Sequence, residues 1–435
     1  MSGGAPRLAY YGDDFTGATD ALATAARAGL RSLLFFGVPS AAQLRRAGPL
    51  DCLGIAGATR AMAPDEMRAA LRPVARFFAA LGARVIHYKV CSTFDSAPQV
   101  GNIAVAMECL GAAARQPWRA IVGGQPSLGR YCLFAQLYAA ADGEMHRIDR
   151  HPTMSRHPVT PMHEADLRRH FAALGAGRVG LVDYRSIAQG PDAVRARIGQ
   201  LLDGGMDSAL FDVARPADLA AIGAVLAGAA AAQPLLAVGA SSVIEAFGTQ
   251  WGDAAAAPPA ALAPARGPVL VLAGSLSPMT ARQIDAAASY RRLRFDPARL
   301  ADGDPVYQAQ AVAAIAQALQ TGQHVLACID NAQGRPSAGV HSQALARAGG
   351  SLLDLVLRRA PVARLGVAGG DSSSLAMQAL DAWGLSYLTR LEPGVALCRL
   401  HSDVAALDGM EVMLKGGQMG SADLFERFAR GQPQG

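Results

Sequence analysis

The sequence is poor in the features that mark nucleic-acid-binding proteins. Aromatic residues make up 6% of its 435 residues and charged residues 17%, and the lysine and arginine residues are scattered along the chain. A nucleic-acid-binding protein usually concentrates its basic residues on one face or in one run. The net charge of +5 instead suits small anionic substrates, because a mild positive excess raises their local concentration. We therefore expect no nucleic-acid partner.

Cysteine is also scarce, and its spacing excludes the common metal and redox motifs. The six cysteines include no C-x-x-C pair, which zinc clusters and redox motifs require. The neighbouring residues His146, His151 and His163 do not follow the H-x-x-x-H spacing of a zinc helix. We expect no resident metal site. The N-terminus carries no signal-peptide pattern, so the expected location is the reducing cytoplasm.

One uncharged stretch, from Leu219 to Ile244, is long enough to cross a bilayer, which takes about 20 residues. It consists largely of alanine and glycine, and Gln233 and Pro234 divide it. We interpret it as a helix, a turn, a strand at Pro234–Val238 and another turn. No membrane association is expected.

What the sequence does contain is a regular alternation of short apolar runs with alanine-rich helical segments, and 51% of its residues are hydrophobic. This alternation predicts α/β folding with mainly parallel sheets. The chain is long enough for two or three domains, since a domain usually takes about 100–200 residues. A proline- and alanine-rich stretch at 254–264 is the best linker. We therefore predict a first domain at 1–252, a linker at 253–266 and a second domain at 267–435.

The predicted elements follow from the apolar periodicity. Strands are expected at Leu8–Tyr11, Ser32–Phe36, Cys52–Ala56, Val85–Tyr88, Ala120–Val122, Gly180–Val182, Ala209–Phe211, Val269–Ala273, His324–Ile329, Leu365–Ala368 and Glu411–Leu414. Helices are expected at Thr16–Ala28, Pro64–Leu81, Pro278–Ser289, Ala309–Gln320, Ser342–Arg358 and Ser373–Trp383.

Two adjacent aspartates, Asp13 and Asp14, follow the first predicted strand and precede a helix that begins at Thr16. Ligands of open α/β sheets lie beyond the carboxyl ends of the strands. Carboxylates at such a point could accept hydrogen bonds from substrate hydroxyls, bind Mg²⁺ or take a proton. The alternative is that Asp14 only caps the helix. A pair of aspartates exceeds what a cap requires, which favours a functional site.

Further polar residues follow other predicted strands of the first domain. A lysine, a thiol, hydroxyls and a carboxylate follow the strand at Val85–Tyr88 and could bind a polyhydroxy acid, although an ordinary polar loop would look similar. Arginine matches a carboxylate bidentately, and histidine could contact substrate or anchor a loop. The candidates are Arg60, Lys89, Cys91, Ser92, Thr93, Asp95 and His157.

Three loops rich in glycine and serine follow strands of the second domain. Small residues let backbone N–H groups approach phosphates, and a helix N-terminus favours negative charge. None of these loops has the G-x-x-x-x-G-K-[ST] pattern of a Walker A motif or the G-x-G-x-x-G fingerprint. The candidates for nucleotide contacts are Ser275, Ser277, Gly369, Gly370, Asp371, Ser372, Ser373, Gly416 and Gly417.

In combination these motifs resemble the four-carbon acid sugar kinases, over nearly the whole chain. The resemblance rests on G-D-D-F-T-G-A-T-D from residue 12, K-V-C-S-T-F-D-S from residue 89, Gly129-Arg130 and R-H-P-V-T-P-M from residue 156. In the second half it rests on A-G-S-L-S-P-M-T-A-R-Q-I, G-G-D-S-S and L-K-G-G-Q-M-G. Three segments depart from the usual family pattern. G-G-D-S-S replaces G-G-E-T-S, K-G-G-Q-M-G replaces K-S-G-N-F-G, and Ala104-Val105 follows G-N-I where the 3-oxo-tetronate kinase branch usually has G-P-V.

The resemblance implies two α/β domains with the active site in the cleft between them. The first domain would bind the acid sugar, with Arg130 and His157 added to its contacts, and the second would bind ATP, with Mg²⁺ bridging the phosphates. Asp14 or Asp13 would deprotonate the acceptor, Lys89 would offset negative charge, and Arg60 would hold the substrate carboxylate.

The resemblance also implies the reaction. The K-x-C-S-T-F-D-S form points to the 3-oxo-tetronate kinase branch, so the expected reaction transfers a phosphoryl group from ATP to the C4 hydroxyl of such an acid. A D-threonate or D-erythronate 4-kinase and a non-catalytic sensor of sugar acid or nucleotide are the alternatives. A homodimer is also expected.

Overall fold

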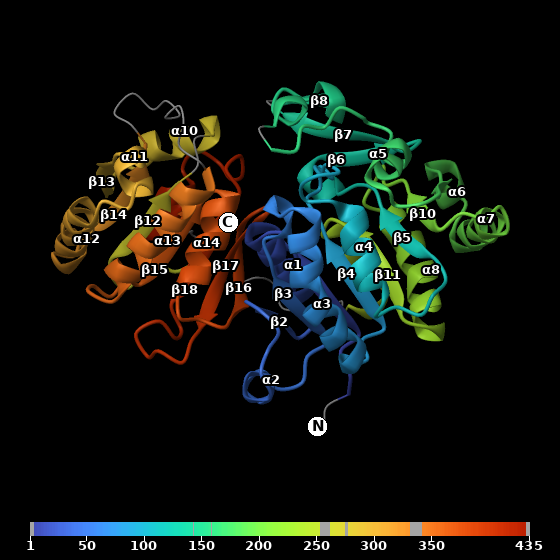
Figure 1. Cartoon of the computed structure of the whole chain (residues 1–435), viewed down its shortest axis with the longest axis horizontal. Helices are drawn as coiled ribbons and strands as arrows, with labels where there is room; N and C mark the ends of the chain where they lie inside the picture. Colours follow the sequence, from blue (N-terminus) through green and yellow to red (C-terminus); the bar gives the residue numbers. More distant parts are fainter. Residues whose placement is uncertain are drawn as a thin grey trace. The chain divides into compact units, whose positions relative to one another are not determined.

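The chain forms two compact units in a computed structural model, which describes residues 4–141, 143–157, 159–252, 262–274, 277–330 and 342–431. The first unit comprises Met1–Leu33 and Gly37–Ala257, and the second comprises Leu34–Phe36 and Pro258–Gly435. Figure 1 colours the first unit from blue to green and most of the second from yellow to red. Three residues near the N-terminus therefore fold with the C-terminal half of the chain.

The sheet of the first unit has the order β3-β1-β4-β11-β5-β10-β9, and all of these neighbours pair in parallel. Every residue of β1, β3, β4 and β11 is buried, as expected for parallel strands that helices cover on both faces. The strands are β1 (Leu8–Gly12), β3 (Cys52–Ala56), β4 (Val85–Lys89), β5 (Arg119–Val122), β9 (Val179–Val182), β10 (Ser208–Phe211) and β11 (Leu235–Gly239).

The helices of the first unit form two packed groups. Helix α3 packs against α4 and α4 against α5, whereas α1 packs against α9 and α9 against α8. The helices are α1 (Phe15–Arg27), α2 (Ala41–Ala47), α3 (Pro64–Leu81), α4 (Ile103–Gly111), α5 (Leu167–Leu174), α6 (Tyr184–Ala188), α7 (Pro191–Asp203), α8 (Asp218–Ala232) and α9 (Ser242–Trp251). The uncharged stretch 219–244 is divided between α8, β11 and α9, which confirms the predicted helix and strand. Its last three residues begin α9, where a turn was expected. None of the helices in the described ranges is long and apolar enough to cross a membrane.

A separate antiparallel sheet, in the order β6-β7-β8, extends from the first unit. Its strands are β6 (Arg130–Leu133), β7 (Gln136–Ala141) and β8 (Glu144–Arg147). Many of their residues are only half-buried, so the apolar runs that revealed the parallel strands are missing here. This sheet was therefore not predicted from the sequence.

The second unit contains a mixed sheet in the order β13-β14-β12-β15-β18-β17-β16. The pairs from β13 to β18 are parallel, while β17 pairs antiparallel with both β18 and β16. At the far edge, β16 pairs antiparallel with residues 34 and 35, which come from β2 (Ser32–Phe35). The other strands are β12 (Val269–Ala273), β13 (Tyr290–Phe295), β14 (His324–Ile329), β15 (Arg364–Ala368), β16 (Gly384–Glu392), β17 (Val395–His401) and β18 (Glu411–Lys415).

The second unit has the helices α10 (Pro278–Ala286), α11 (Pro297–Ala301), α12 (Pro305–Gln320), α13 (Ser342–Leu357), α14 (Gly370–Ala379) and α15 (Leu424–Arg430). The helix predicted at Ser373–Trp383 is wrong at its C-terminal end, because Leu380 is already extended. Trp383 precedes β16 and stacks between Phe35 and His401. Burial of the indole ring in the core thus replaces the helical turn that the sequence suggested. The predicted α/β class with mainly parallel sheets is confirmed.

Candidate active site

The N-terminus of α1 presents the two aspartates that the sequence singled out. Asp14 is the N-cap residue, and its Oδ1 accepts a hydrogen bond of 2.6 Å from the backbone N–H of Gly17. Its Oδ2 accepts a hydrogen bond of 2.8 Å from the hydroxyl of Thr16. Asp14 therefore caps α1, and whether capping is its only role stays open. Asp13 is equally buried and takes no part in the cap.

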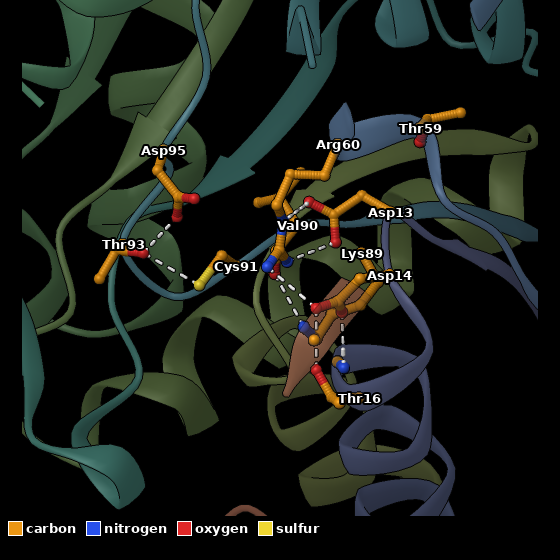
Figure 2. Close-up of polar contacts among 12 residues, drawn as sticks. Asp13, Asp14, Thr16, Thr59, Arg60, Lys89, Val90, Cys91, Thr93 and Asp95 are labelled. Atoms are coloured by element: carbon orange, nitrogen blue, oxygen red, sulfur yellow. Dashed lines mark hydrogen bonds and ion pairs between the residues drawn. The ribbon is translucent and has the colours of Figure 1, made fainter. Parts of the chain in front are cut away.

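Arg60 holds both aspartates (Figure 2). It lies in a 3-10 turn just after β3, and its Nε and one terminal nitrogen contact the two oxygens of Asp13 at 3.1 and 2.8 Å. The other terminal nitrogen lies 2.9 Å from Asp14 Oδ2. One guanidinium group thus bridges two buried carboxylates, an arrangement that arginine's planar fork permits.

The proton affinity of Asp13 is increased by its surroundings. Burial raises the pKa of Asp13, the charge of Arg60 opposes this, and the neighbouring Asp14 raises it further. The net direction is upward, because the loss of water outweighs the attraction of the guanidinium group. A carboxylate with a raised pKa is suited to accept a proton during a reaction.

Lys89 is the last residue of β4 and is buried beside the same turn. Its Nζ donates a hydrogen bond of 2.8 Å to the carbonyl of Val90. A methyl group added to Gly17 would lie 2.8 Å from this Nζ and 2.6 Å from Asp14 Oδ1. Glycine at position 17 therefore lets the lysine ammonium approach the helix N-terminus.

The loop after β4 adds a second polar group to the site. The Thr93 hydroxyl donates to Asp95 and lies 2.9 Å from the sulfur of Cys91, and Ser92 is buried in the same loop. Burial alone would raise the pKa of Asp95, but the charge of Arg60 and the Thr93 hydrogen bond lower it overall. Burial raises the pKa of the Cys91 thiol, which does not suit a nucleophile.

His157 reaches this loop through a threonine. Its Nδ1 accepts a hydrogen bond of 3.1 Å from the backbone N–H of Thr160, whose hydroxyl lies 3.3 Å from Asp95 Oδ2. His157 is thus linked through Thr160 to the loop that contains Asp95.

Arg130 begins β6, and its backbone pairs with Gln125. Gln125 in turn donates a hydrogen bond of 3.3 Å to Asp20 of α1. Neither Gln125 nor Asp20 was among the predicted site residues. Asp20 ends the motif that begins at Gly12, which was a signal that could have found it, whereas Gln125 belongs to none of the motifs.

The glycine- and serine-rich loops of the second unit lie at the carboxyl ends of β12, β15 and β18. Ser277 caps α10 and its hydroxyl donates to the carbonyl of Gly417 at 2.5 Å. Gly369, with φ at 124°, turns the chain from β15 into α14. Ser372 and Ser373 are buried in the first turn of that helix, which also contains Gly370. Ser275 and the side chain of Asp371 lie outside the described residues.

Gly416 and Gly417 directly follow Lys415, the last residue of β18. The Lys415 side chain is fully buried, and its Nζ donates to the Thr280 hydroxyl at 3.0 Å and to the carbonyl of Gly417 at 3.2 Å. Lys415 therefore connects the first turn of α10 to the loop after β18. Burial lowers the pKa of Lys415 to about 7.

The chain contains only two lysines among its 40 basic residues, Lys89 and Lys415. Each is buried at the carboxyl end of a parallel strand, one in each unit. Lys89 was among the predicted site residues and Lys415 was not, although the scarcity of lysine was a signal that could have found it.

Family models match both halves of the chain. A sugar-binding N-terminal domain matches residues 8–247, and a nucleotide-binding C-terminal domain matches residues 270–425. The chain belongs to the four-carbon acid sugar kinase family. The family membership indicated by its motifs is thus confirmed.

Several similar proteins cover almost the full length of the chain. A 3-oxo-isoapionate kinase of Paraburkholderia graminis is 38% identical, over 98% of this chain and 95% of its own. A 3-oxo-tetronate kinase of Cupriavidus necator is 32% identical, over 98% and 97%. Among solved structures, a Salmonella typhimurium LT2 protein has a TM-score of 0.80 at 25% identity, over 97% of this chain and 98% of its own. Protein HI1011 of Haemophilus influenzae has a similar fold, with a TM-score of 0.70 at 22% identity, over 96% and 98%.

Proposed function

We propose that this protein is an ATP-dependent kinase that phosphorylates the C4 hydroxyl of a four-carbon 3-oxo acid sugar. The observation that carries the proposal is the pair of buried aspartates bridged by Arg60 beside the buried ammonium of Lys89. It lies within the part of the chain that matches a sugar-binding domain. Phosphoryl transfer depends mainly on positioning and charge stabilisation, and this cluster offers both.

Asp13 is the residue that we propose as the general base. The carboxylate oxygens of Asp14 contact Gly17, Thr16 and Arg60. Those of Asp13 contact Arg60 alone among the described side chains. Asp13 therefore keeps lone pairs for the acceptor hydroxyl, and its raised pKa favours taking the proton. The oxygen then attacks the γ-phosphorus of ATP, and the bond from that phosphorus to the oxygen of the leaving ADP breaks.

Lys89 offsets the negative charge that gathers on the acceptor oxygen and the transferred group, since its ammonium is held close to the N-terminus of α1. Arg60 orients the two carboxylates and offsets the repulsion between them. We therefore propose for Arg60 a different role from the one that the resemblance implied, because all three of its guanidinium nitrogens already contact aspartate.

The nucleotide would bind at the loops 369–373 and 416–417, in the part of the chain that matches a nucleotide-binding domain. The N-terminus of α14 follows Gly369 and supplies backbone N–H groups of the kind that bind phosphate. Among the described residues, no group of three or more histidine, cysteine or acidic side chains could hold a metal ion. Mg²⁺ would therefore arrive bound to the ATP phosphates, which it prefers as oxygen ligands.

The substrate panel for a test follows from the similar proteins. A coupled ADP-release assay should include the 3-oxo-tetronates and 3-oxo-isoapionate, because the 38% identical relative bears the latter name. D-Threonate and D-erythronate test the alternative, and the highest kcat/KM identifies the substrate. Phosphorus NMR of the product locates the new phosphate. Absence of turnover with every acid would refute the kinase proposal and favour a sugar-acid or nucleotide sensor.

The base is tested with two variants. Asp13→Asn should lower kcat by about 100-fold or more, which is the usual contribution of general base catalysis. Asp14→Asn keeps a capping side chain at the start of α1 and should lower kcat less. A larger loss in Asp14→Asn would assign the base to Asp14.

We also propose a cytoplasmic homodimer. The six cysteines are all free, which agrees with a reducing compartment, and most soluble oligomers are symmetric homo-oligomers. Light scattering at micromolar concentration would give the mass, and a monomer at all concentrations would contradict the dimer.

A further inference from the structure

The first unit places two arginines near the candidate site, and they differ in how they are paired. Arg60 makes three contacts with two carboxylates, so its positive charge is more than balanced within the protein. An incoming carboxylate would have to compete with Asp13 and Asp14 for the same guanidinium group. Arg60 is therefore a poor receptor for an acidic substrate.

Arg130 is the opposite case. One of its terminal nitrogens donates to the carbonyl of Leu128, while its Nε is buried and has no hydrogen-bond partner in the described part of the chain. It forms no ion pair with the described residues either. Burial lowers the pKa of Arg130, yet an arginine stays protonated in proteins. A charged donor left without a partner is costly, and a bound anion would remove that cost.

The position of Arg130 fits this role. An electrostatic interaction links Arg130 to Cys91, whose sulfur lies 2.9 Å from the Thr93 hydroxyl of the candidate site. The backbone of Arg130 is fixed to Gln125, which is bonded to α1 through Asp20. Arg130 is thus connected to α1 through Gln125 and Asp20, and it interacts electrostatically with the loop that contains Cys91. The residue is only half-buried, so a ligand can reach it.

We propose that Arg130, rather than Arg60, binds the carboxylate of the acid sugar and selects acids over neutral sugars. This assignment rests on the proposed function of the site. The planar guanidinium group has five N–H donors in a fixed fork that matches a carboxylate, and in the described structure one of its nitrogens is engaged by Leu128.

The test compares an acid with a neutral analogue in the full-length chain. The acid is the best substrate of the panel above, and the analogue is the corresponding four-carbon ketose, in which a hydroxymethyl group replaces the carboxylate. Arg130→Gln should lower kcat/KM for the acid by about 100-fold, as expected for the loss of hydrogen bonds between charged groups. For the ketose kcat/KM should change by less than about threefold.

Two further variants test whether the charge of Arg130 or its planar shape binds the carboxylate, and whether a loss is specific to the acid. Arg130→Lys keeps the charge but loses the fork, so it should fall between the wild type and Arg130→Gln. Arg60→Gln should lower kcat/KM for the acid and the ketose equally, because Arg60 serves the aspartates. The control is Arg195→Gln on α7, whose side chain is 56% exposed, and it should leave both values unchanged. Equal losses for acid and ketose in Arg130→Gln, or no loss with the acid, would overturn the assignment.

Calorimetry measures tetronate binding without turnover, so it can test the Arg130 assignment even if the kinase proposal fails. If the wild type binds a tetronate but turns over none, the kinase proposal fails while the Arg130 assignment is still tested by binding. Arg130→Gln should then weaken tetronate binding by about 100-fold, with a melting temperature like that of the wild type. If Arg130→Gln does not fold, Arg130→Lys must show the smaller loss for the acid alone. A wild type that binds none of the acids would overturn both proposals.

Discussion

Replacing Lys415 by methionine should change how the stability of the second unit depends on pH. The Lys415 side chain is 0% exposed, and its ammonium contacts a threonine hydroxyl, a carbonyl and the ring of Phe425 at 5.9 Å. None of these partners carries a negative charge. Burial therefore lowers the pKa of Lys415 from the usual 10.5 to about 7.

The sign and size of the effect follow from this pKa. Between about pH 7 and pH 10.5 the unfolded chain binds a proton that the folded chain has released, so the stability of the wild type rises with pH in that range. The cost of burying the lysine is about 5 kcal/mol at pH 6 and falls to about 2 kcal/mol at pH 9. Methionine carries no proton, so Lys415→Met does not follow this trend.

The measurement is the difference in melting temperature between Lys415→Met and the wild type at pH 6 and pH 9. We expect the variant's relative stability to fall by about 3 kcal/mol over this range, or about 5–10 °C for a unit of this size. Gln283→Leu removes a buried hydrogen-bonding side chain from the same region without removing a titratable group, so its difference from the wild type should not vary with pH.

A second measurement reads the titration directly. Lysine-selective ¹³C labelling gives signals from only two side chains, and loss of the Lys415 signal in the variant assigns them. A midpoint near 10.5 for Lys415, or a difference in melting temperature that is constant or grows with pH, would refute the reasoning.

Three other changes test the first unit. Gly17→Ala places a methyl group 2.6 Å from the capping carboxylate and should lower kcat by about 10-fold or more. In the control Gly228→Ala the added methyl group meets nothing within 4 Å, so kcat should stay the same and the unfolding free energy should rise by about 0.5–1 kcal/mol. Equal kcat values for the two variants would contradict the first expectation. In Arg60→Gln the pKa of Asp13 should rise further, because the positive charge that lowers it is lost. The acid limb of the profile of kcat/KM against pH should therefore move to higher pH. An acid limb that does not move would exclude Asp13 as the base. Asp212→Ala removes a buried carboxylate that accepts three backbone N–H bonds and should cost about 3–5 kcal/mol in urea unfolding, and a loss below about 1 kcal/mol would show that water replaces it.

The parallel strands were predictable because their residues are buried on both sides. The strand at Cys52–Ala56 was predicted with the bounds that the structure shows, and those of β1 and β4 were one residue short. The antiparallel strands β6, β7 and β8 were not predicted, because half-buried strands mix polar and apolar residues and lack a continuous apolar run. Trp383 fits a helical period in sequence but packs between two aromatic rings instead.

The candidate site also has a part that was predictable from the sequence and a part that was not. The paired aspartates and Lys89 could be selected from the sequence, since strand ends in parallel sheets gather ligands. Their partners could not, because Asp13 and Arg60 are separated by 47 residues and no local pattern states that they meet. Arg60 and Arg130 cannot be distinguished by residue type. Only the structure shows that the guanidinium groups of the two residues have different partners.

By itself the sequence determined the α/β class and the family, and it selected candidate site residues at the carboxyl ends of strands, since all of these depend on local periodicity and short motifs. The tertiary structure decided which charges meet. It paired Arg60 with two aspartates, left the Nε of Arg130 without a partner among the described residues, and buried the ammonium of Lys415 between α10 and the loop after β18. The physical reason is that the proton affinity and the binding capacity of a charged side chain are set by burial and by the nearest opposite charge, and both arise only when distant segments pack together.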